Sequence, residues 1–379
     1  MKKQIKPAKQ NTSADAALFK EICELILSAR SAVVRNINAV QVVTSFEIGR
    51  RIVEHEQKGS NRAAYGKQIL KELSKQLFNE FGAGFSERNL RNMRKFYLVY
   101  QGRLSQIRQM PSAKLTSGQK SQTPSDKLGV IEKTKSLSVK FSLSWSQYIF
   151  LIGIKNGGVR SFYEIEAVNN NWTLPELTRQ FNSGLYERLA LSRDKDGVRK
   201  LAKEGQVVTK QEDLLKEPYV LEFLGIDEKA KYSESDLESA IIDKLEHFLL
   251  ELGKGFLFEA RQKRFTFDED HFFVDLVFYN RLLGCYVLID LKIGKLTHQD
   301  LGQMQMYVNY FDRYVKTKDE GLTIGIILCR KKREALVEIT LPKDANIHAK
   351  EYQLYLPSKE ELKRKLLDWT SGQDVGNEE

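Results

Sequence analysis

The sequence predicts an α+β protein, in which an all-α N-terminal region precedes a mixed α/β domain. Apolar residues recur at three- and four-residue spacing through most of the first 190 residues, a period typical of helices. Beyond residue 220 this period alternates with short apolar runs bounded by turn residues, which favour strands. The charge divides near the same point: residues 1–220 carry 37 Lys and Arg against 21 Asp and Glu, whereas residues 221–379 carry 23 against 29. We therefore expect two parts with different roles.

Composition bounds the class of protein. The 379 residues are 41% hydrophobic and 10% aromatic, enough for two or three packed domains. The three cysteines, Cys23, Cys285 and Cys329, lie far apart, which argues against a disulfide framework or a Cys-rich zinc site. No apolar run reaches the roughly 20 residues of a membrane span, and the basic start lacks the apolar stretch of a signal peptide. These features predict a cytoplasmic protein without a membrane partner.

Changes in composition suggest where the parts begin and end. The first residues are rich in Lys, Gln and Ser, and a second stretch rich in Ser, Lys, Gln and Pro interrupts the helical region. In chain order, we predict a disordered basic tail at 1–15, a helical domain at 16–195 with a flexible insertion at 107–135, a linker at 196–219, the mixed α/β domain at 220–357, and a C-terminal helix and tail at 358–379.

The mixed domain follows a simple order of elements. An amphipathic helix is predicted over 233–252, and a second helix over 297–314 with Thr297 and Asp300 as its capping pair. Apolar and alternating runs predict the strands, at 256–267, 271–279, 285–291, 322–329 and 352–356. The first helix, three strands, second helix and next strand give the order α-β-β-β-α-β, with a mixed sheet.

The hairpin between the second and third strands brings two carboxylates together. If Asn280 pairs with Cys285 across the turn, opposite residues have numbers that sum to 565, so Asp275 lies opposite Asp290. Lys292 is two residues further on and therefore points to the same face as Asp290. Two carboxylates among apolar residues repel each other and are costly to desolvate, and a bound divalent cation relieves both problems. The alternative is a salt-bridge cluster on a solvent-facing sheet.

This set of residues suits phosphodiester hydrolysis. Mg²⁺ prefers carboxylate oxygens and keeps several waters, one of which can become the nucleophile. The Lys292 ammonium can orient or help deprotonate that water and offset charge on the phosphate. Gln303 and Tyr307 stand four apart on the second helix and share a face, although such pairs are often ordinary surface polars. Glu238 lies in the first helix, where it could instead form a capping box with Ser235.

These residues resemble the PD-(D/E)XK nuclease superfamily, whose restriction-endonuclease-like domain has the same α-β-β-β-α-β order. The motif is Asp275 followed by Asp290-Leu-Lys292, with Glu238 matching the helix glutamate. Gln303-Met-Gln-Met-Tyr307 looks like the QxxxY element of the RecB-like branch. The resemblance implies Mg²⁺, or Mn²⁺ in its place, held by Asp275, Asp290 and Glu238.

Within the superfamily, the chain is most similar to the bacterial YhcG-like family. The similar segments in its N-terminal half are Gly84-Phe-Ser-Glu-Arg-Asn-Leu, Leu143-Ser-Trp-Ser and Leu185-Tyr-Glu-Arg-Leu-Ala-Leu-Ser-Arg. One departure is Asp290, where we expect Glu in the family, and the shorter carboxylate could change the metal geometry. The family resemblance implies a nuclease fold without naming a substrate.

A basic helix in the N-terminal region is the predicted DNA-binding element. Arg88, Arg91 and Lys95 are spaced to share one helix face, and Asn89 and Asn92 flank them. A Gly-containing turn followed by such a helix is typical of a helix-turn-helix, in which cations contact phosphates and amides contact base edges. The alternative is a solvated cationic face on a helical interaction domain. The family resemblance also implies a helix-turn-helix-like region.

Together these features predict a Mg²⁺-dependent deoxyribonuclease, an endonuclease with a role in restriction, mobile-element defence or repair. One alternative is a catalytically inactive DNA-binding scaffold that retains the nuclease fold, and another is an RNA-directed nuclease. A homodimer would supply the two active sites that cleavage of both duplex strands usually takes.

Overall fold

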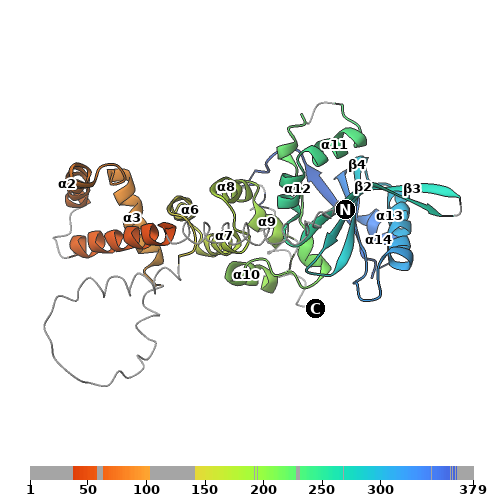
Figure 1. The fold of residues 1–379 in the computed structure, drawn as a ribbon, viewed down its shortest axis with the longest axis horizontal. Coiled ribbons are helices and arrows are strands. Elements are labelled where there is room, and N and C mark those ends of the chain that lie inside the picture. Colours follow the sequence, from red (N-terminus) through yellow and green to blue (C-terminus); the bar gives the residue numbers. More distant parts are fainter. Residues whose placement is uncertain are drawn as a thin grey trace, which may run out of the picture. The chain divides into compact units, whose positions relative to one another are not determined.

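The structure is a computed structural model, and it divides into two compact units, Met1–Lys155 and Asn156–Glu379 (Figure 1). It describes residues 37–57, 63–102 and 141–364, apart from positions 192, 194, 228–230, 268, 343, 359, 361 and 363. The predicted tail at 1–15 and the predicted insertion at 107–135 lie outside the described residues. None of the described helices combines the length and the apolar character that crossing a bilayer requires.

The first unit is helical. Its described helices are one at 37–57, α2 (Ala63–Phe81), α3 (Glu87–Tyr100) and α6 (Trp145–Leu151). Its core is aromatic: the buried ring of Phe96 lies 5.0–5.3 Å, centroid to centroid, from Phe141, Trp145 and Tyr148. Trp145 and Tyr148 are therefore core residues. A Cβ at Gly49 would lie 2.1 Å from the Met93 carbonyl oxygen, so only glycine allows the helix at 37–57 to approach α3 this closely.

The second unit begins with four further helices. These are α7 (Gly157–Asn169), α8 (Leu174–Asn182), α9 (Leu185–Ala190) and α10 (Lys195–Glu204). The segment predicted as a linker, 196–219, contains most of α10, the 3₁₀ turn η1 (Gln211–Leu214) and the first residue of a short strand. Its chain is therefore largely in regular structure.

A six-stranded mixed sheet forms the centre of this unit, in the order β1-β6-β5-β4-β3-β2. The strands are β1 (Tyr219–Val220), β2 (Phe256–Phe267), β3 (Asp270–Asn280), β4 (Cys285–Lys295), β5 (Ile324–Lys331) and β6 (Ile347–Gln353). β2, β3 and β4 pair antiparallel, whereas β4, β5, β6 and β1 pair parallel. The mixed α/β character predicted beyond residue 220 is confirmed.

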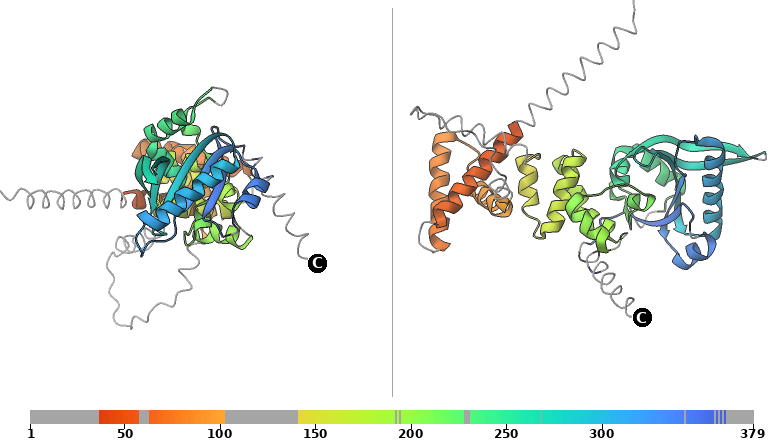
Figure 2. Two further views of the ribbon diagram at one scale, coloured as in Figure 1. Left: turned by 90° about the vertical axis from the view of Figure 1, so that its right-hand side faces the viewer. Right: turned by 90° about the horizontal axis from the view of Figure 1, so that it is seen from below.

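Helices cover both faces of the sheet (Figure 2). On one face, α11 (Glu234–Asp243) and α12 (Leu245–Leu252) pack Leu237, Ile241 and Phe248 against the odd-numbered residues of β4, such as Ile289. On the other face, α13 (His298–Tyr310) packs Leu301 and Met304 against Leu288. Since side chains alternate along a strand, Asp290 and Lys292 belong to the α13 face.

Two helical predictions need correction. The predicted helix 233–252 is two helices, because Lys244 leaves the helical region with φ −119° and ψ 31°. The apolar spacing continues across this break, so periodicity could not reveal it. The short helix α14 (Glu334–Thr340) was not predicted, and β6 begins at Ile347, five residues before the predicted strand 352–356. The predicted 297–314 helix ends in a π-helical turn, Phe311–Val315.

A buried ion cluster ties α12 to the helices before the sheet. Glu251 is fully buried and accepts hydrogen bonds from Arg188, from Arg179 at 2.9 Å and from the backbone N–H of Val220 at 3.0 Å. Burial acts to raise the pKa of Glu251, but the charges of Arg188, Lys216 and Arg179 outweigh it and lower the pKa to about 2. The carboxylate is therefore charged throughout the physiological range.

Candidate active site

The β3–β4 hairpin has the predicted register, and its backbone pairing ends one residue before Asp275 and Asp290. Asn280 pairs with Cys285, and the pairing runs to Leu276 opposite Ile289. Beyond this pair, the Oδ2 atom of Asp275 accepts a hydrogen bond from the backbone N–H of Leu291 at 2.8 Å. The Asp275 side chain thus lies across the end of the ladder, beside Asp290. Asp290 itself pairs with Ile327 of β5.

Asp290 is a buried carboxylate beside a second one. Its side chain is 3% exposed, and its Oδ2 atom lies 2.9 Å from the Nζ atom of Lys292. That buried oxygen forms no hydrogen bond of good geometry within the described chain, so the contact is an ion pair. Burial, and then the charge of Asp275, raise the pKa of Asp290 well above its usual value. The environment therefore favours a further cation.

Lys292 carries the positive charge of this group. Burial acts to lower its pKa, but the charges of Asp290 and Glu234 outweigh burial and hold the pKa above its usual value. Glu234 stands in the first turn of α11, with its Oε2 atom 3.6 Å from Lys292 Nζ. Its Oε1 atom accepts a hydrogen bond from the backbone N–H of Ile293 at 3.3 Å. Lys292 is therefore an ammonium held between two carboxylates.

Glu238 joins the site through a glutamine. Gln262 of β2 donates from Nε2 to Glu238 at 2.6 Å and to Asp275 Oδ1 at 2.9 Å. Glu238 is buried and also pairs with Arg261. It does not form a capping box, since Ser233 and Asp236 cap α11. Glu238 thus fixes Asp275 indirectly, and its own charge is already partnered.

Gln303 and Tyr307 are not ordinary surface residues. The Gln303 amide donates to the Tyr307 hydroxyl, and Tyr307 is 1% exposed on the α13 face of the sheet. Burial raises the pKa of Tyr307, the hydrogen bond from Gln303 lowers it, and the charges of Asp290 and Asp275 raise it further. Tyr307 therefore lies on the α13 face of the sheet, the face to which Asp290 also belongs.

The donor set fits a divalent cation bound through two carboxylates. Asp275 and Asp290 offer oxygen atoms, the ligands that Mg²⁺ and Mn²⁺ prefer. Within the described ranges, no group of three or more His, Cys, Asp or Glu side chains is arranged to hold a metal. The fit rests on the buried Oδ2 atom of Asp290, which lacks a hydrogen bond, and on the repulsion between the two carboxylates. Glu238 is connected to this pair of carboxylates through the Gln262 side chain, which lies between Glu238 and Asp275.

The predicted DNA-binding residues lie on α3. Arg88, Arg91 and Lys95 are exposed, and Asn92 is half-buried. Arg91 pairs with Glu87, whereas neither Arg88 nor Lys95 forms an ion pair with any described residue.

Asn89 is committed to the fold. Its side-chain amide donates to the Gly84 carbonyl at 2.5 Å and its oxygen accepts from Trp145 Nε1 at 3.0 Å. Its backbone N–H donates to the Ser86 hydroxyl, which makes Ser86 the N-cap of α3. Of the predicted cationic residues on α3, Arg88 and Lys95 therefore remain without an ion pair to the described residues.

Comparison with known proteins decides the family. The chain is 41% identical over 348 residues to an Escherichia coli (strain K12) protein whose name is "Putative nuclease YhcG", and the match covers 91% of this chain and 92% of that protein. The chain belongs to the YhcG family. Residues 212–367 match the model of the YhcG PDDEXK nuclease domain, and residues 21–188 match that of the DUF1016 N-terminal domain.

A solved structure, a repair endonuclease from Pyrococcus abyssi, is a distant comparison. It shares 18% identity with a TM-score of 0.23, over 35% of this chain and 50% of that chain. The YhcG family membership rests on the sequence matches alone.

Three polar residues of this YhcG-family site were missed from the sequence: Glu234, Arg261 and Gln262. Gln262 lies opposite Asp275, between the pairs Arg261–Leu276 and Lys263–Val274, with a φ of +46°. That left-handed conformation is uncommon outside glycine, and nothing in the local sequence signals it. Glu234 had one weak signal, an acidic residue in the first turn of a capped helix.

Proposed function

We propose that this chain is a divalent-metal-dependent endonuclease that hydrolyses phosphodiester bonds of DNA. The observation that carries the proposal is Asp290: it is buried, it faces Asp275, and its unbonded Oδ2 atom lies 2.9 Å from the Lys292 ammonium. Two carboxylates held together among apolar residues lower the stability of the fold, because they are desolvated and repel each other. A bound divalent ion would offset this loss. Membership of a nuclease family supports the same assignment.

Each residue has a distinct role in this proposal. Asp275 and Asp290 would hold Mg²⁺, which supplies a water of lowered pKa and charge for the phosphate. Lys292 has a raised pKa, so it stays protonated and donates hydrogen bonds to the water and to a phosphate oxygen. It does not act as a general base while Asp290 is ionised. Gln262 and Glu238 hold Asp275 in place.

Gln303 and Tyr307 are positioning residues in this scheme. Because Gln303 donates to the Tyr307 hydroxyl, that hydroxyl keeps its own proton free to donate toward the carboxylates or the DNA strand. The helical N-terminal region would hold the substrate through a helix-turn-helix-like element that includes α3. There, Arg88 and Lys95, which form no ion pair within the described ranges, offer cations for phosphates.

The test is cleavage of closed circular DNA in Mg²⁺ or Mn²⁺, compared with EDTA. Wild type should nick or linearise the circle only with the metal, whereas Asp290→Asn and Lys292→Ala should leave it intact. Lys295→Ala is the matched control, because it removes an exposed cation from the same strand, three residues beyond the site. Undiminished cleavage by Asp290→Asn overturns the assignment. Binding without product in every divalent ion supports a scaffold, and cleavage of RNA alone identifies an RNA-directed nuclease.

A further inference from the structure

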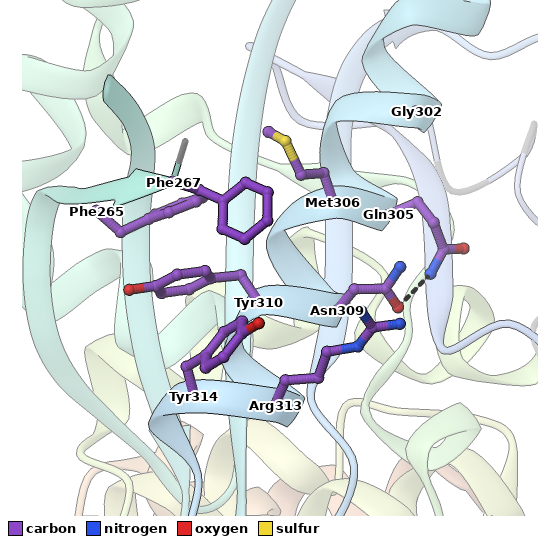
Figure 3. Close-up of a pocket in the computed structure, with 9 residues that line it drawn as sticks. All are labelled: Phe265, Phe267, Gly302, Gln305, Met306, Asn309, Tyr310, Arg313 and Tyr314. Atoms are coloured by element: carbon purple, nitrogen blue, oxygen red, sulfur yellow. Dashed lines mark hydrogen bonds between the residues drawn. The ribbon is translucent and has the colours of Figure 1, made fainter. Parts of the chain in front are cut away.

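A pocket of about 330 Å³ lies between the end of β2 and α13 (Figure 3). Phe265 and Phe267 project into it from the strand, and Tyr310 and Tyr314 project from the helix and the π-helical turn that follows. The volume falls at the small end of the range for ligand sites, about 300–1,000 Å³. The roles proposed above for the active site use none of these four rings.

Two of these rings are stacked on each other, and two others are open to solvent. The Phe265 and Tyr310 rings are stacked, with centroids 4.1 Å apart and planes 21° apart, and Tyr310 lies 5.3 Å from Tyr314. Phe267 is 52% exposed and Tyr314 is 63% exposed. Large exposed rings grouped in a concave site are typical of a binding surface. Their apolar surface is in contact with water, and burying it under another molecule is favourable.

The rim of the pocket is polar and cationic. Gln305 donates to Asn309 at 3.1 Å, which leaves amide groups on both side chains able to pair with another molecule. Arg313 is exposed and forms no ion pair with any described residue. Amides can recognise base edges, and a guanidinium can bind phosphate. Aromatic rings for stacking beside a cation for the backbone are the features that bind single-stranded nucleic acid.

The pocket adjoins the candidate active site. The Phe265 ring lies 5.6 Å from the ring of Tyr307, in an edge-to-face contact, and Tyr307 is hydrogen-bonded to Gln303. On α13, Met306 lines the pocket and is the neighbour of Tyr307. The Phe265 ring therefore lies between the pocket and Tyr307 of the candidate active site.

We propose that this pocket holds an unpaired nucleobase of the substrate strand, close to the phosphodiester bond that the site cleaves. The proposal rests on the proposed nuclease function and adds a substrate preference: DNA that carries an unpaired nucleotide, such as an overhang, a gap or a fork, should be cleaved faster than intact duplex. In smooth duplex DNA every base is stacked and paired, so no base can enter the pocket without being flipped out.

The test is the fluorescence of 2-aminopurine placed at an unpaired position of a DNA oligonucleotide, measured in EDTA so that no cleavage occurs. Stacking on the rings should quench the signal when the protein binds, and the same base within a duplex should not respond. Phe267→Ala and Tyr314→Ala should each weaken binding of the unpaired strand about 5- to 150-fold, the usual value of one base–aromatic stack. Tyr355→Ala is the matched control, because it removes an exposed tyrosine outside the pocket.

A second variant blocks the pocket without removing a ring. Gly302 lines the pocket, and a Cβ at this position would meet no atom within 4 Å, so Gly302→Leu adds bulk at the pocket wall and Gly302→Ala serves as its control. Gly302→Leu should abolish the quenching, and Gly302→Ala should preserve it.

Each outcome decides the proposal. Quenching that is lost in the ring variants and in Gly302→Leu supports it. No fluorescence change in the wild type overturns it, as do unchanged affinities in all three variants. Self-association that Phe267→Ala abolishes, without quenching, assigns the pocket to a second copy of the chain instead. The fluorescence measurement needs neither metal nor cleavage. It therefore tests whether the pocket binds a base even if the protein does not cleave DNA.

Discussion

Replacing Asp290 by asparagine should stabilise the nuclease domain while it abolishes cleavage. Burial and the neighbouring Asp275 raise the pKa of Asp290, so the folded state binds this proton more tightly than the unfolded state. The stability of the wild type should therefore fall as the pH rises from about 4 through the raised pKa. Asparagine has nearly the same shape and never ionises, so the variant lacks this loss.

The size of the gain follows from the environment of Asp290. Desolvation and the charge of Asp275 raise the pKa of Asp290 from its ordinary value near 4 to about 7, and a pKa difference of one corresponds to about 1.4 kcal/mol. The lost ion pair with Lys292 is already included, since the pKa of Asp290 is raised despite that partner. We expect Asp290→Asn to gain about 1–4 kcal/mol at pH 8 and almost nothing near pH 4. A domain of this size should then melt at least about 2 °C higher at pH 8.

The assay is thermal unfolding of both proteins at pH 4 and pH 8, without metal and in excess Mn²⁺. Mn²⁺ at 1,000 times its Kd should reverse the order at pH 8, because it adds about 4.1 kcal/mol to a protein that binds it, which exceeds the gain expected for the variant. A variant that is less stable than the wild type at pH 8 would refute the reasoning, and so would a difference that is equal at both pH values.

The remaining predictions concern the buried ion cluster, the Gln262 bridge and the basic face of α3. Glu251→Gln should lower the free energy of unfolding by about 3–5 kcal/mol in urea titrations, because Arg188 stays buried without its carboxylate. The pKa of Glu251 is lowered to about 2 in the fold, so wild-type stability should fall between about pH 4.5 and pH 2, a slope that the variant lacks. Gln262→Gly should reduce kcat for DNA cleavage about tenfold, because Asp275 and Glu238 lose the amide donor that they share. Arg88→Ala combined with Lys95→Ala should reduce the slope of log affinity against log salt by about 2 in DNA-binding anisotropy, and an unchanged slope would remove α3 from the DNA interface.

The β3–β4 hairpin and its pair of carboxylates could be predicted from local rules. Strand alternation and the turn between Asn280 and Cys285 fixed the hairpin register, which in turn placed Asp275 beside Asp290. The capping pair Thr297 and Asp300 forms as predicted, because a capping box depends only on residues three apart. Such features need no knowledge of the tertiary structure.

The surroundings of the carboxylates could not be predicted in the same way. Glu238 pairs with Arg261 across two elements, and Gln262 reaches Asp275 through a backbone conformation that its residue type disfavours. The break at Lys244 is equally hidden, since the apolar spacing of α11 continues into α12. These features depend on contacts between elements distant in the sequence, which local periodicity does not record.

The most direct test of the catalytic centre is anomalous diffraction from crystals of the full chain soaked in Mn²⁺. We predict a peak between the carboxylates of Asp275 and Asp290 in the wild type, and its loss in Asp290→Asn crystals soaked in the same way. Absence of the peak at saturating Mn²⁺, or the same peak in the variant, would contradict the account.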